Sequence, residues 1–289
     1  MWTIKGEHDK RGKGLIGQII KVKKSFCEVK AEQIINCSVR GNVKKLRPVV
    51  GDMVEIDKDN AICSILPRNS YFIRPLCANV DCVNIVLASV PKPDFLVVDR
   101  LIAMAIHGGA KVILTVNKSD LSTEVADYVN ENYNSVVDKI FIVSAVNKSG
   151  TEKLKEYLTG KLVVFAGQSA VGKTSLINGI FSENFKVGEL SRKTQRGKNT
   201  TTASSIIEDS GIRVMDTPGF TSLYALNIPL EELKNCYPEF ANKTCYFNDC
   251  NHLSEPDCGV KKALEQGEIS VDRYNRYKTI YNEIKEQKI

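Results

Sequence analysis

Long apolar runs are missing from this sequence. The longest lies near Cys82–Val90, well below the ~18 apolar residues that a membrane-spanning helix needs. The opening stretch, MWTIKGEHDKRGKG, carries charges but no apolar segment after them, unlike a secretory signal. We therefore expect a cytoplasmic protein that is not attached to a membrane.

A disulfide framework is also not expected. The chain has nine cysteines, an odd number, and no secretion signal accompanies them. Six are scattered, mostly in apolar stretches, and are predicted to be small buried side chains: Cys27, Cys37, Cys63, Cys77, Cys82 and Cys236. The other three, Cys245, Cys250 and Cys258, surround His252 and leave metal binding open.

The excess positive charge of the chain is confined to its N-terminal quarter. Residues 1–70 hold 14 Lys and Arg against 8 Asp and Glu, whereas the remaining residues hold 26 of each. Two interpretations stay open. The basic segment is a footprint for nucleic acid, or it is a solvated basic surface.

Short β-type segments alternate with turns from about Gly14 to Ile65 and predict a small barrel. The stretch RGNVKKLRPVVGD places four basic side chains in one loop: Arg40, Lys44, Lys45 and Arg47. An oligonucleotide-binding (OB) barrel uses such loops for nucleic acid. An SH3-like barrel would give the same sequence pattern.

From about Arg74 the pattern changes to apolar strands alternating with helices, which predicts a parallel sheet covered on both faces. The expected strands are Val83–Val90, Lys111–Val116, Ile140–Val143, Leu162–Ala166 and Ile212–Met215. The expected helices are Phe95–His107, Val125–Tyr133 and Lys173–Phe181. Ligands of such sheets bind at the carboxyl ends of the strands, where the motifs below lie.

A phosphate-binding loop follows the strand at Leu162–Ala166. Gly167 and Gly172 allow backbone N–H groups to turn toward phosphates, and a helix N-terminus follows. Lys173 reaches the outer phosphates, and the Thr174 hydroxyl ligates Mg²⁺. The predicted contact residues are Gly167, Gln168, Ser169, Ala170, Val171, Gly172, Lys173, Thr174 and Ser175.

Three further strand ends complete a predicted GTP site. Asp216 opens the sequence Asp-Thr-Pro-Gly, in which a carboxylate can hold Mg²⁺ through water and the Gly219 N–H can meet a γ-phosphate. The loop Asn117, Lys118, Ser119 and Asp120 is typical of guanine readers. The Asp120 carboxylate can accept two hydrogen bonds that guanine offers and adenine lacks. The pair Ser144 and Ala145 places a backbone N–H near the guanine O6.

The order of these motifs is permuted. GTPases usually place the phosphate loop first, whereas here the base reader precedes it. A circular permutation accounts for this order, because domain termini are often close and cuts in surface loops are tolerated. It also leads the Asp216–Gly219 turn directly into the C-terminal region, so a movement of Gly219 could pull on that region.

The motif order, the small barrel and the Cys/His cluster together resemble the ribosome small-subunit-dependent GTPase A family of circularly permuted bacterial GTPases. The resemblance covers nearly the whole chain. It implies an OB-fold barrel that contacts ribosomal RNA (residues 1–70), a permuted α/β P-loop GTPase domain (71–224) and a mostly helical zinc subdomain (225–289). It further implies a role in late maturation of the small ribosomal subunit, whose binding stimulates GTP hydrolysis.

The metal pattern matches this family residue by residue. Cys245, Cys250, His252 and Cys258 form a Cys₃His set, which suits one tetrahedral structural zinc without an open position. The segment is too small for a core of its own, so metal binding is expected to supply much of its folding energy. A terminal amphipathic helix near Ile269–Glu286 is expected to pack on the domain, with partner binding as the alternative.

One position departs from the family. The switch sequence usually contains a His that orients the attacking water, and this chain has Asn199 instead. Phe220 lies where Ras-type enzymes place a Gln for the same purpose. We expect slow intrinsic turnover, with Thr201 as the favoured Mg²⁺ ligand among Thr200–Thr202 and with Lys173, Asn199, Thr201 and Gly219 as the catalytic set. Four nearby basic residues contact RNA or are simply solvated: Arg192, Lys193, Arg196 and Lys198.

Three functions follow from these motifs. The leading hypothesis is a monomeric GTPase switch that binds GTP, GDP, Mg²⁺ and the small ribosomal subunit with its rRNA. The second is a GTP-dependent RNA-binding assembly factor with negligible hydrolysis, which the Asn199 substitution favours. The third, an ATPase or small-molecule kinase, conflicts with Asp120 and with the lack of a recognisable acceptor site.

Overall fold

The computed structural model describes residues 14–181, 204–216 and 226–287. The chain forms two compact units. The first comprises Met1–Val83, Thr151–Phe165 and Thr174–Phe220, and the second comprises Asn84–Gly150, Ala166–Lys173 and Thr221–Ile289. Each unit therefore gathers segments that are separated along the chain.

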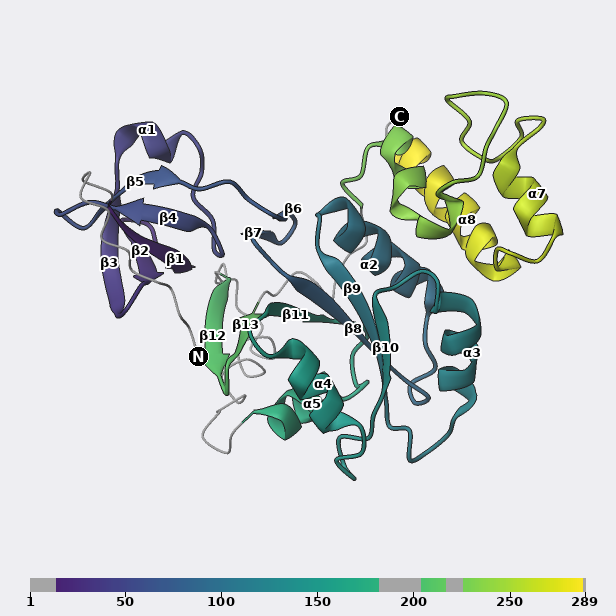
Figure 1. The fold of residues 1–289 in the computed structure, drawn as a ribbon, viewed down its shortest axis with the longest axis horizontal. Helices are drawn as coiled ribbons and strands as arrows, with labels where there is room; N and C mark the ends of the chain where they lie inside the picture. The colour runs from purple at the N-terminus through teal and green to yellow at the C-terminus, as the bar shows by residue number, and fades with distance from the viewer. Residues whose placement is uncertain (1–13, 182–203, 217–225, 288–289) are drawn as a thin grey trace. The chain divides into compact units, whose positions relative to one another are not determined.

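Five strands of the first unit close into a barrel (Figure 1). They are β1 (Leu15–Val22), β2 (Cys27–Lys30), β3 (Ile34–Val39), β4 (Met53–Ile56) and β5 (Ala61–Ile65). β1 pairs with both β2 and β4, and β3 pairs in parallel with β5, so the ring runs β1-β2-β3-β5-β4. This closed ring fits the OB-fold and confirms the predicted N-terminal barrel.

The barrel core follows from the alternation of buried and half-exposed residues along β2 and β4. Its buried apolar side chains are Ile19, Cys27, Val29, Cys37, Val43, Val54, Ile56 and Ile62. A buried carboxylate, Asp52, adds polar contacts next to this core. It accepts hydrogen bonds from the Val49 N–H and from the Arg68 guanidinium, at 2.7–2.9 Å. The predicted basic loop differs from expectation by containing a short helix, α1 (Gly41–Lys44).

The rest of the first unit contains a second group of strands. β11 (Leu162–Ala166) and β13 (Ile212–Asp216) are parallel, and β12 (Ser205–Asp209) runs antiparallel to β13. β12 also meets β1, where Lys21 and Ser205 are partners. The same part of the structure contains a hairpin and two helices. The hairpin is formed by β6 (Tyr71–Ile73) and β7 (Leu76–Ala78), and the helices are α4 (Thr151–Leu158) and α5 (Lys173–Ile180).

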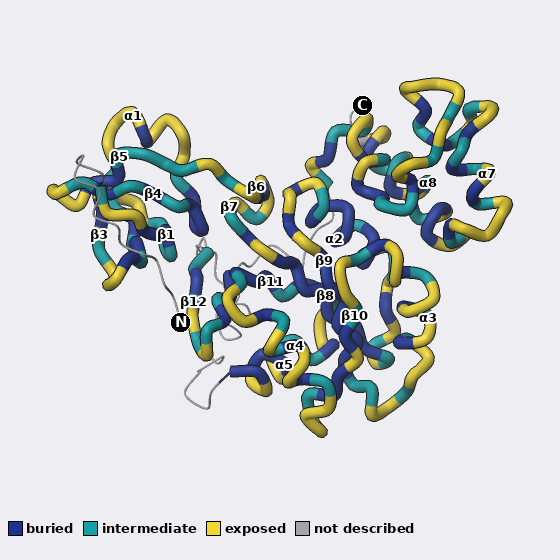
Figure 2. Tube along the Cα trace, in the orientation of Figure 1, coloured by how far each residue is buried: buried dark blue, intermediate teal, exposed yellow. Residues whose placement is uncertain are grey.

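The second unit contains the strands that carry the base-reading residues. β8 (Cys82–Ala88) is buried along its length, and β9 (Lys111–Asn117) is buried after its first residue (Figure 2). β10 (Lys139–Ile142) runs parallel to β9. α2 (Phe95–His107) and α3 (Glu124–Tyr133) follow β8 and β9 in the chain. Asp94 caps α2, because its carboxylate accepts the N–H groups of Leu96 and Val97.

The C-terminal part of the second unit is mostly helical, as predicted. It contains η1 (Leu230–Cys236), η2 (Pro238–Phe240), α7 (Gly259–Glu265) and α8 (Val271–Gln287). Tyr274, Tyr277 and Ile284 of α8 are buried in a core shared with η1, η2 and α7. The apolar face of the terminal helix is thus covered within its own unit. Among the helices of the described residues, none is both long and apolar enough to cross a bilayer.

Candidate nucleotide site and metal centre

The loop after β11 has the backbone that a phosphate cradle needs. Gly167 and Gly172 have φ angles of 125° and 89°, in the region that favours glycine. A Cβ on Gly167 would lie 2.3 Å from the Val86 carbonyl oxygen, and one on Gly172 would lie 2.5 Å from Asn117 Nδ2. Both glycines are therefore required by conformation and by space.

Lys173 lies inside this loop. Its Nζ donates to the carbonyl oxygens of Gly167, at 2.8 Å, and Gln168, at 2.5 Å. Burial lowers the pKa of Lys173 to about 8, because a desolvated ammonium loses its charge more easily. Thr174 and Ser175 follow in the first turn of α5 and are exposed.

Asn117 joins the base-reading loop to the phosphate loop. Its Nδ2 donates to the Val171 carbonyl oxygen at 3.0 Å, and its Oδ1 accepts from the Ala145 N–H at 3.1 Å. The side chain is only 2% exposed, so both hydrogen bonds are shielded from water. The structure thus brings together three segments that are far apart in the sequence.

Lys118 supports the same arrangement. Its φ angle is 60°, which turns the loop sharply after β9. Its Nζ donates to the carbonyl oxygens of Ala170, at 2.9 Å, and Val90, at 2.6 Å. The ammonium is consequently fixed, and the alkyl stem is held between the base-reading loop and the phosphate loop.

Asp120 is oriented by Ser144. The buried Ser144 hydroxyl donates to Asp120 Oδ1 at 2.5 Å and accepts from the Asn147 N–H at 3.2 Å. The sequence pattern predicted only a backbone contact of Ser144 and Ala145 with the base, and it contains no signal for this side-chain contact. The Asp120 carboxylate itself is exposed and can present its second oxygen to a ligand.

Three of the predicted catalytic residues lie outside the described residues: Asn199, Thr201 and Gly219. The same holds for Thr200, Thr202, Phe220, Arg192, Lys193, Arg196 and Lys198. Asp216 is described. It is half-buried at the end of β13, where it pairs in register with Ser205 of β12.

The four predicted metal ligands lie together in the second unit. The ligand atoms of Cys245, Cys250, His252 and Cys258 all lie within 4.8 Å of one another. The Cys245 and Cys258 sulfurs are 3.8 Å apart and lie 3.5 and 3.4 Å from His252 Nδ1. Ligands of a tetrahedral ion bound at ~2.0–2.3 Å are roughly 3.5–3.8 Å apart. The cluster can therefore hold a metal ion.

The loop around this cluster is fixed by hydrogen bonds from neighbouring residues. Tyr274 and Tyr277 of α8 donate their hydroxyls to the carbonyl oxygens of His252, at 2.6 Å, and Asn251, at 2.7 Å. Glu255 accepts the N–H groups of Asn251 and Leu253. These contacts hold the ligand-bearing loop against α8.

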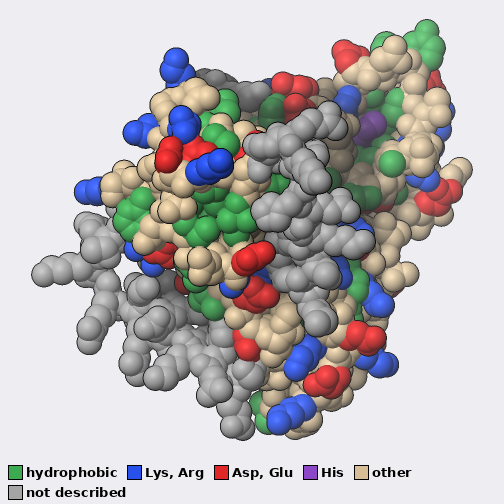
Figure 3. All heavy atoms as spheres, turned by 60° about the vertical axis from the view of Figure 1, so that its left-hand side comes forward, with side chains coloured by type: hydrophobic (Ala, Val, Ile, Leu, Met, Phe, Trp, Pro, Cys, Tyr) green, Lys and Arg blue, Asp and Glu red, His purple; other side chains and the backbone are tan. Residues whose placement is uncertain are grey.

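The basic loop of the barrel is only partly available to a partner. Arg40 is paired with Asp57, whereas Lys44, Lys45 and Arg47 are exposed. On the face presented in Figure 3, Lys and Arg side chains are interspersed with acidic and apolar ones. Among the described residues, these three exposed cations of the barrel loop are thus the best candidates for contacts with phosphates.

The strand order, the phosphate loop and the base-reading loop define a P-loop GTPase with circularly permuted motifs. The family model RsgA GTPase matches residues 65–226, and the RsgA N-terminal domain matches residues 16–65. The chain belongs to the RsgA GTPase family. This confirms the resemblance that the sequence motifs indicated.

Curated relatives and solved structures agree with this family assignment. The small ribosomal subunit biogenesis GTPase RsgA of Ruminiclostridium cellulolyticum is 40% identical over 270 residues, which cover 89% of this chain and 88% of the relative. The protein of the same name from Caldanaerobacter subterraneus is 40% identical over 285 residues, covering 94% and 96%.

Two solved structures share the fold. The crystal structure of YjeQ from Thermotoga maritima has a TM-score of 0.79 at 33% identity and covers 93% of this chain and 98% of that one. The structure of YloQ, described as a circularly permuted GTPase, has a TM-score of 0.78 at 30% identity, covering 97% and 98%.

Proposed function

We propose that the protein binds GTP and GDP and hydrolyses GTP at the loops joined by Asn117. The observation that supports this most strongly is a pair of hydrogen bonds of the Asn117 amide, which donates to the Val171 carbonyl oxygen and accepts from the Ala145 N–H. One buried side chain holds the base-reading loop and the phosphate loop at a fixed separation. A single nucleotide can then be recognised at its base and at its phosphates.

Different residues are proposed to bind the base, the phosphates and the metal ion. Asp120 accepts the guanine N1–H and amino group, and Lys118 lays its stem along the base. The backbone of Gly167–Ser175 surrounds the phosphates, and the Lys173 ammonium neutralises their charge. Bound Mg²⁺ would withdraw charge from the transferred phosphoryl group, and we propose Thr174, Asp216 through water, and Thr201 as its holders.

Catalysis is proposed to rely on positioning. Asn199 can hydrogen-bond the attacking water but cannot carry a proton at neutral pH. Gly219 can donate its N–H to the γ-phosphate. Phosphoryl transfer depends mainly on alignment and charge stabilisation, so we expect slow intrinsic turnover that a bound partner accelerates.

The partner we propose is the small ribosomal subunit, during its maturation in the cytoplasm. The names of the curated relatives and the exposed Lys44, Lys45 and Arg47 of the barrel support this proposal. Cations on a barrel loop bind phosphates in a salt-dependent way. We propose that the protein acts as a monomer, with residues 1–70 binding RNA, 71–224 forming the GTPase domain and 225–289 forming the zinc subdomain.

Zinc is the proposed ion of the Cys₃His cluster. Three thiolates and one imidazole favour zinc over oxygen-preferring cations, and four protein ligands leave no open position for chemistry. Its role would be to hold the loop of Cys245–Cys258 in shape against α8.

A second candidate function keeps nucleotide binding but not catalysis. Because Asn199 stands where the family usually has a His, the protein could be a GTP-dependent RNA-binding assembly factor with negligible hydrolysis. Titrating GTP hydrolysis with purified small subunits at two salt concentrations separates the two. We expect stimulation that weakens at the higher salt. Nucleotide binding without stimulation would favour the second function, and no binding of GDP would exclude both.

A further inference from the structure

The loop between β8 and α2 is contacted from both halves of the proposed nucleotide site. At its beginning, the Val90 carbonyl oxygen accepts from Lys118 of the base-reading loop at 2.6 Å. At its end, the Asp94 N–H donates to Gln168 Oε1 of the phosphate loop at 3.1 Å. The sequence motifs assign Gln168 only to the phosphate loop in general and assign nothing to residues 89–94.

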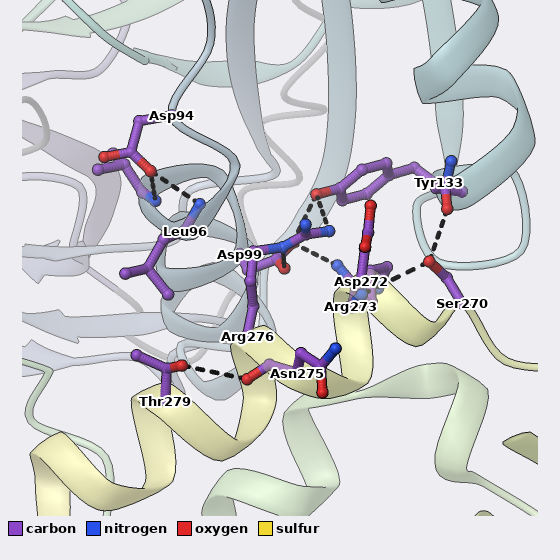
Figure 4. Close-up of polar contacts among 12 residues, drawn as sticks. Asp94, Leu96, Asp99, Tyr133, Ser270, Asp272, Arg273, Asn275, Arg276 and Thr279 are labelled. Carbon is purple, nitrogen blue, oxygen red and sulfur yellow. Dashed lines mark hydrogen bonds and ion pairs between the residues drawn. The ribbon is translucent and has the colours of Figure 1, made fainter.

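Asp94 is also the N-cap of α2, directly before its first residue, Phe95. Its carboxylate caps the helix by accepting the N–H groups of Leu96 and Val97 (Figure 4). Its own N–H donates to Gln168 Oε1. A helix is stiff over its length, with a rise of ~1.5 Å per residue. A displacement of Gln168 therefore acts on α2 at its first turn, about 8 Å along the axis from Asp99.

Asp99 locks α2 to the C-terminal helix. The fully buried carboxylate accepts from Arg273 and Arg276 of α8, each at 2.5 Å, and from the Tyr133 hydroxyl at 2.8 Å (Figure 4). The next residue of α2, Arg100, pairs with Glu283 of α8. Separating a buried ion pair leaves an uncompensated charge, so these two helices must move together.

α8 continues the connection to the metal-binding loop. Tyr274 lies next to Arg273 in the sequence, and its hydroxyl holds the His252 carbonyl oxygen. The contacts from Gln168 through α2 and α8 to His252 all lie within the second compact unit. None of them involves the Asp216–Gly219 turn.

We propose that Gln168 is a positioning residue that links the phosphate loop to the metal-binding loop; this inference rests on the proposed nucleotide site. When a nucleotide binds at the phosphate loop, Gln168 passes the structural change through α2 and α8 to the metal-binding loop. The phosphate loop surrounds phosphates that GDP and GTP share, whereas switch segments respond to the γ-phosphate. GDP alone is therefore sufficient to engage this connection. A transmission that ran only through the Asp216–Gly219 turn would require GTP.

Hydrogen exchange resolved to single amides tests the proposal in the full-length protein. The arms are nucleotide-free protein, GDP and a non-hydrolysable GTP analogue. In the unsubstituted protein we expect GDP and the analogue to slow exchange alike at the start of α2 and in residues 271–280 of α8. Protection of α8 by the analogue alone would overturn the proposal.

Gln168→Met removes the acceptor and keeps the length of the side chain. It should raise the exchange rate of the Asp94 amide about fivefold even without nucleotide, the factor expected for one lost hydrogen bond. At GDP concentrations that saturate the variant, it should lack the GDP-dependent protection of α8. Lys92→Gln, at an exposed position of the loop between β8 and α2, should keep the slow exchange of the Asp94 amide and the GDP-dependent protection of α8.

A second variant tests whether the contact between α2 and α8 lies after the contact between Gln168 and Asp94. Arg100→Gln breaks the contact with Glu283 but leaves Gln168 intact, so it should reduce protection of α8 and not of the Asp94 amide. Full GDP-dependent protection of α8 in Gln168→Met would refute the inference while leaving the proposed function standing. Absence of GDP binding by the unsubstituted protein would instead refute the proposed function, and this inference with it.

Discussion

Raising the pH from about 7 to about 8.5 should weaken GDP binding because of Lys173. Burial lowers the pKa of this ammonium to about 8. Phosphates favour the charged form, so the pKa rises when nucleotide binds and binding takes up a proton above pH 8. The affinity is thus fully present below the pKa of the free protein and declines as the pH rises through it.

The size of the effect follows from the protonated fraction. With a pKa of about 8, that fraction falls from roughly 0.9 at pH 7 to roughly 0.24 at pH 8.5, which predicts about a fourfold loss of affinity. A lysine with an ordinary pKa near 10.4 would lose almost nothing over this range.

Isothermal titration calorimetry with GDP at both pH values, in buffers of matched ionic strength, measures the change. Lys173→Arg is the matched control, because a guanidinium stays charged throughout and the ionisation of the nucleotide is common to both proteins. Its affinity should be lower but nearly independent of pH. Equal pH dependence in the two proteins would show that Lys173 is not the titrating group.

Four further outcomes are expected. Asp120→Asn should weaken the affinity for GTP by roughly 100-fold or more, because the two guanine donors lose their charged acceptor, while the affinity for ATP measured by competition stays unchanged. Cys258→Ser should lose the bound metal by elemental analysis and lower the melting temperature, whereas Cys63→Ser should retain the metal. Arg68→Ala should destabilise the barrel by about 3 kcal/mol in urea unfolding, since Asp52 is fully buried and would lose its only positively charged partner among the described residues. The triple variant Lys44→Ala, Lys45→Ala and Arg47→Ala should bind single-stranded RNA with a weaker dependence on salt. The slope of log affinity against log salt concentration should fall in magnitude by about 2, at ~0.7 per lost phosphate contact. An unchanged slope would show that the loop is merely solvated.

Local patterns predicted the elements that carry the site. The strand Leu162–Ala166 and the helix Phe95–His107 have the expected bounds, because apolar runs and helical periodicity are local properties of the sequence. β12 (Ser205–Asp209) and α4 (Thr151–Leu158) were not predicted. Both are rich in polar residues, and neither gives a strong apolar pattern.

Side-chain pairings were harder to predict than elements. The contact between Gln168 and Asp94 spans 74 positions, and that between Arg273 and Asp99 spans 174. A single sequence contains no local signal for such pairs, since any of many acidic residues could accept an arginine. An Asp directly before an apolar helix is a typical N-cap, but nothing near Asp94 in the sequence indicates its partner in the phosphate loop.

The hydrogen bonds of Asn117 limit how this protein can be dissected into fragments. Ending the chain at Gly150 would keep the base-reading residues but delete Val171, and beginning it at Thr151 would keep the phosphate loop without Asn117. Either fragment loses a partner on which its loop depends, and the first also leaves a buried amide donor unsatisfied. Nucleotide affinity measured on such pieces would report damage to the scaffold instead of the contribution of the deleted part.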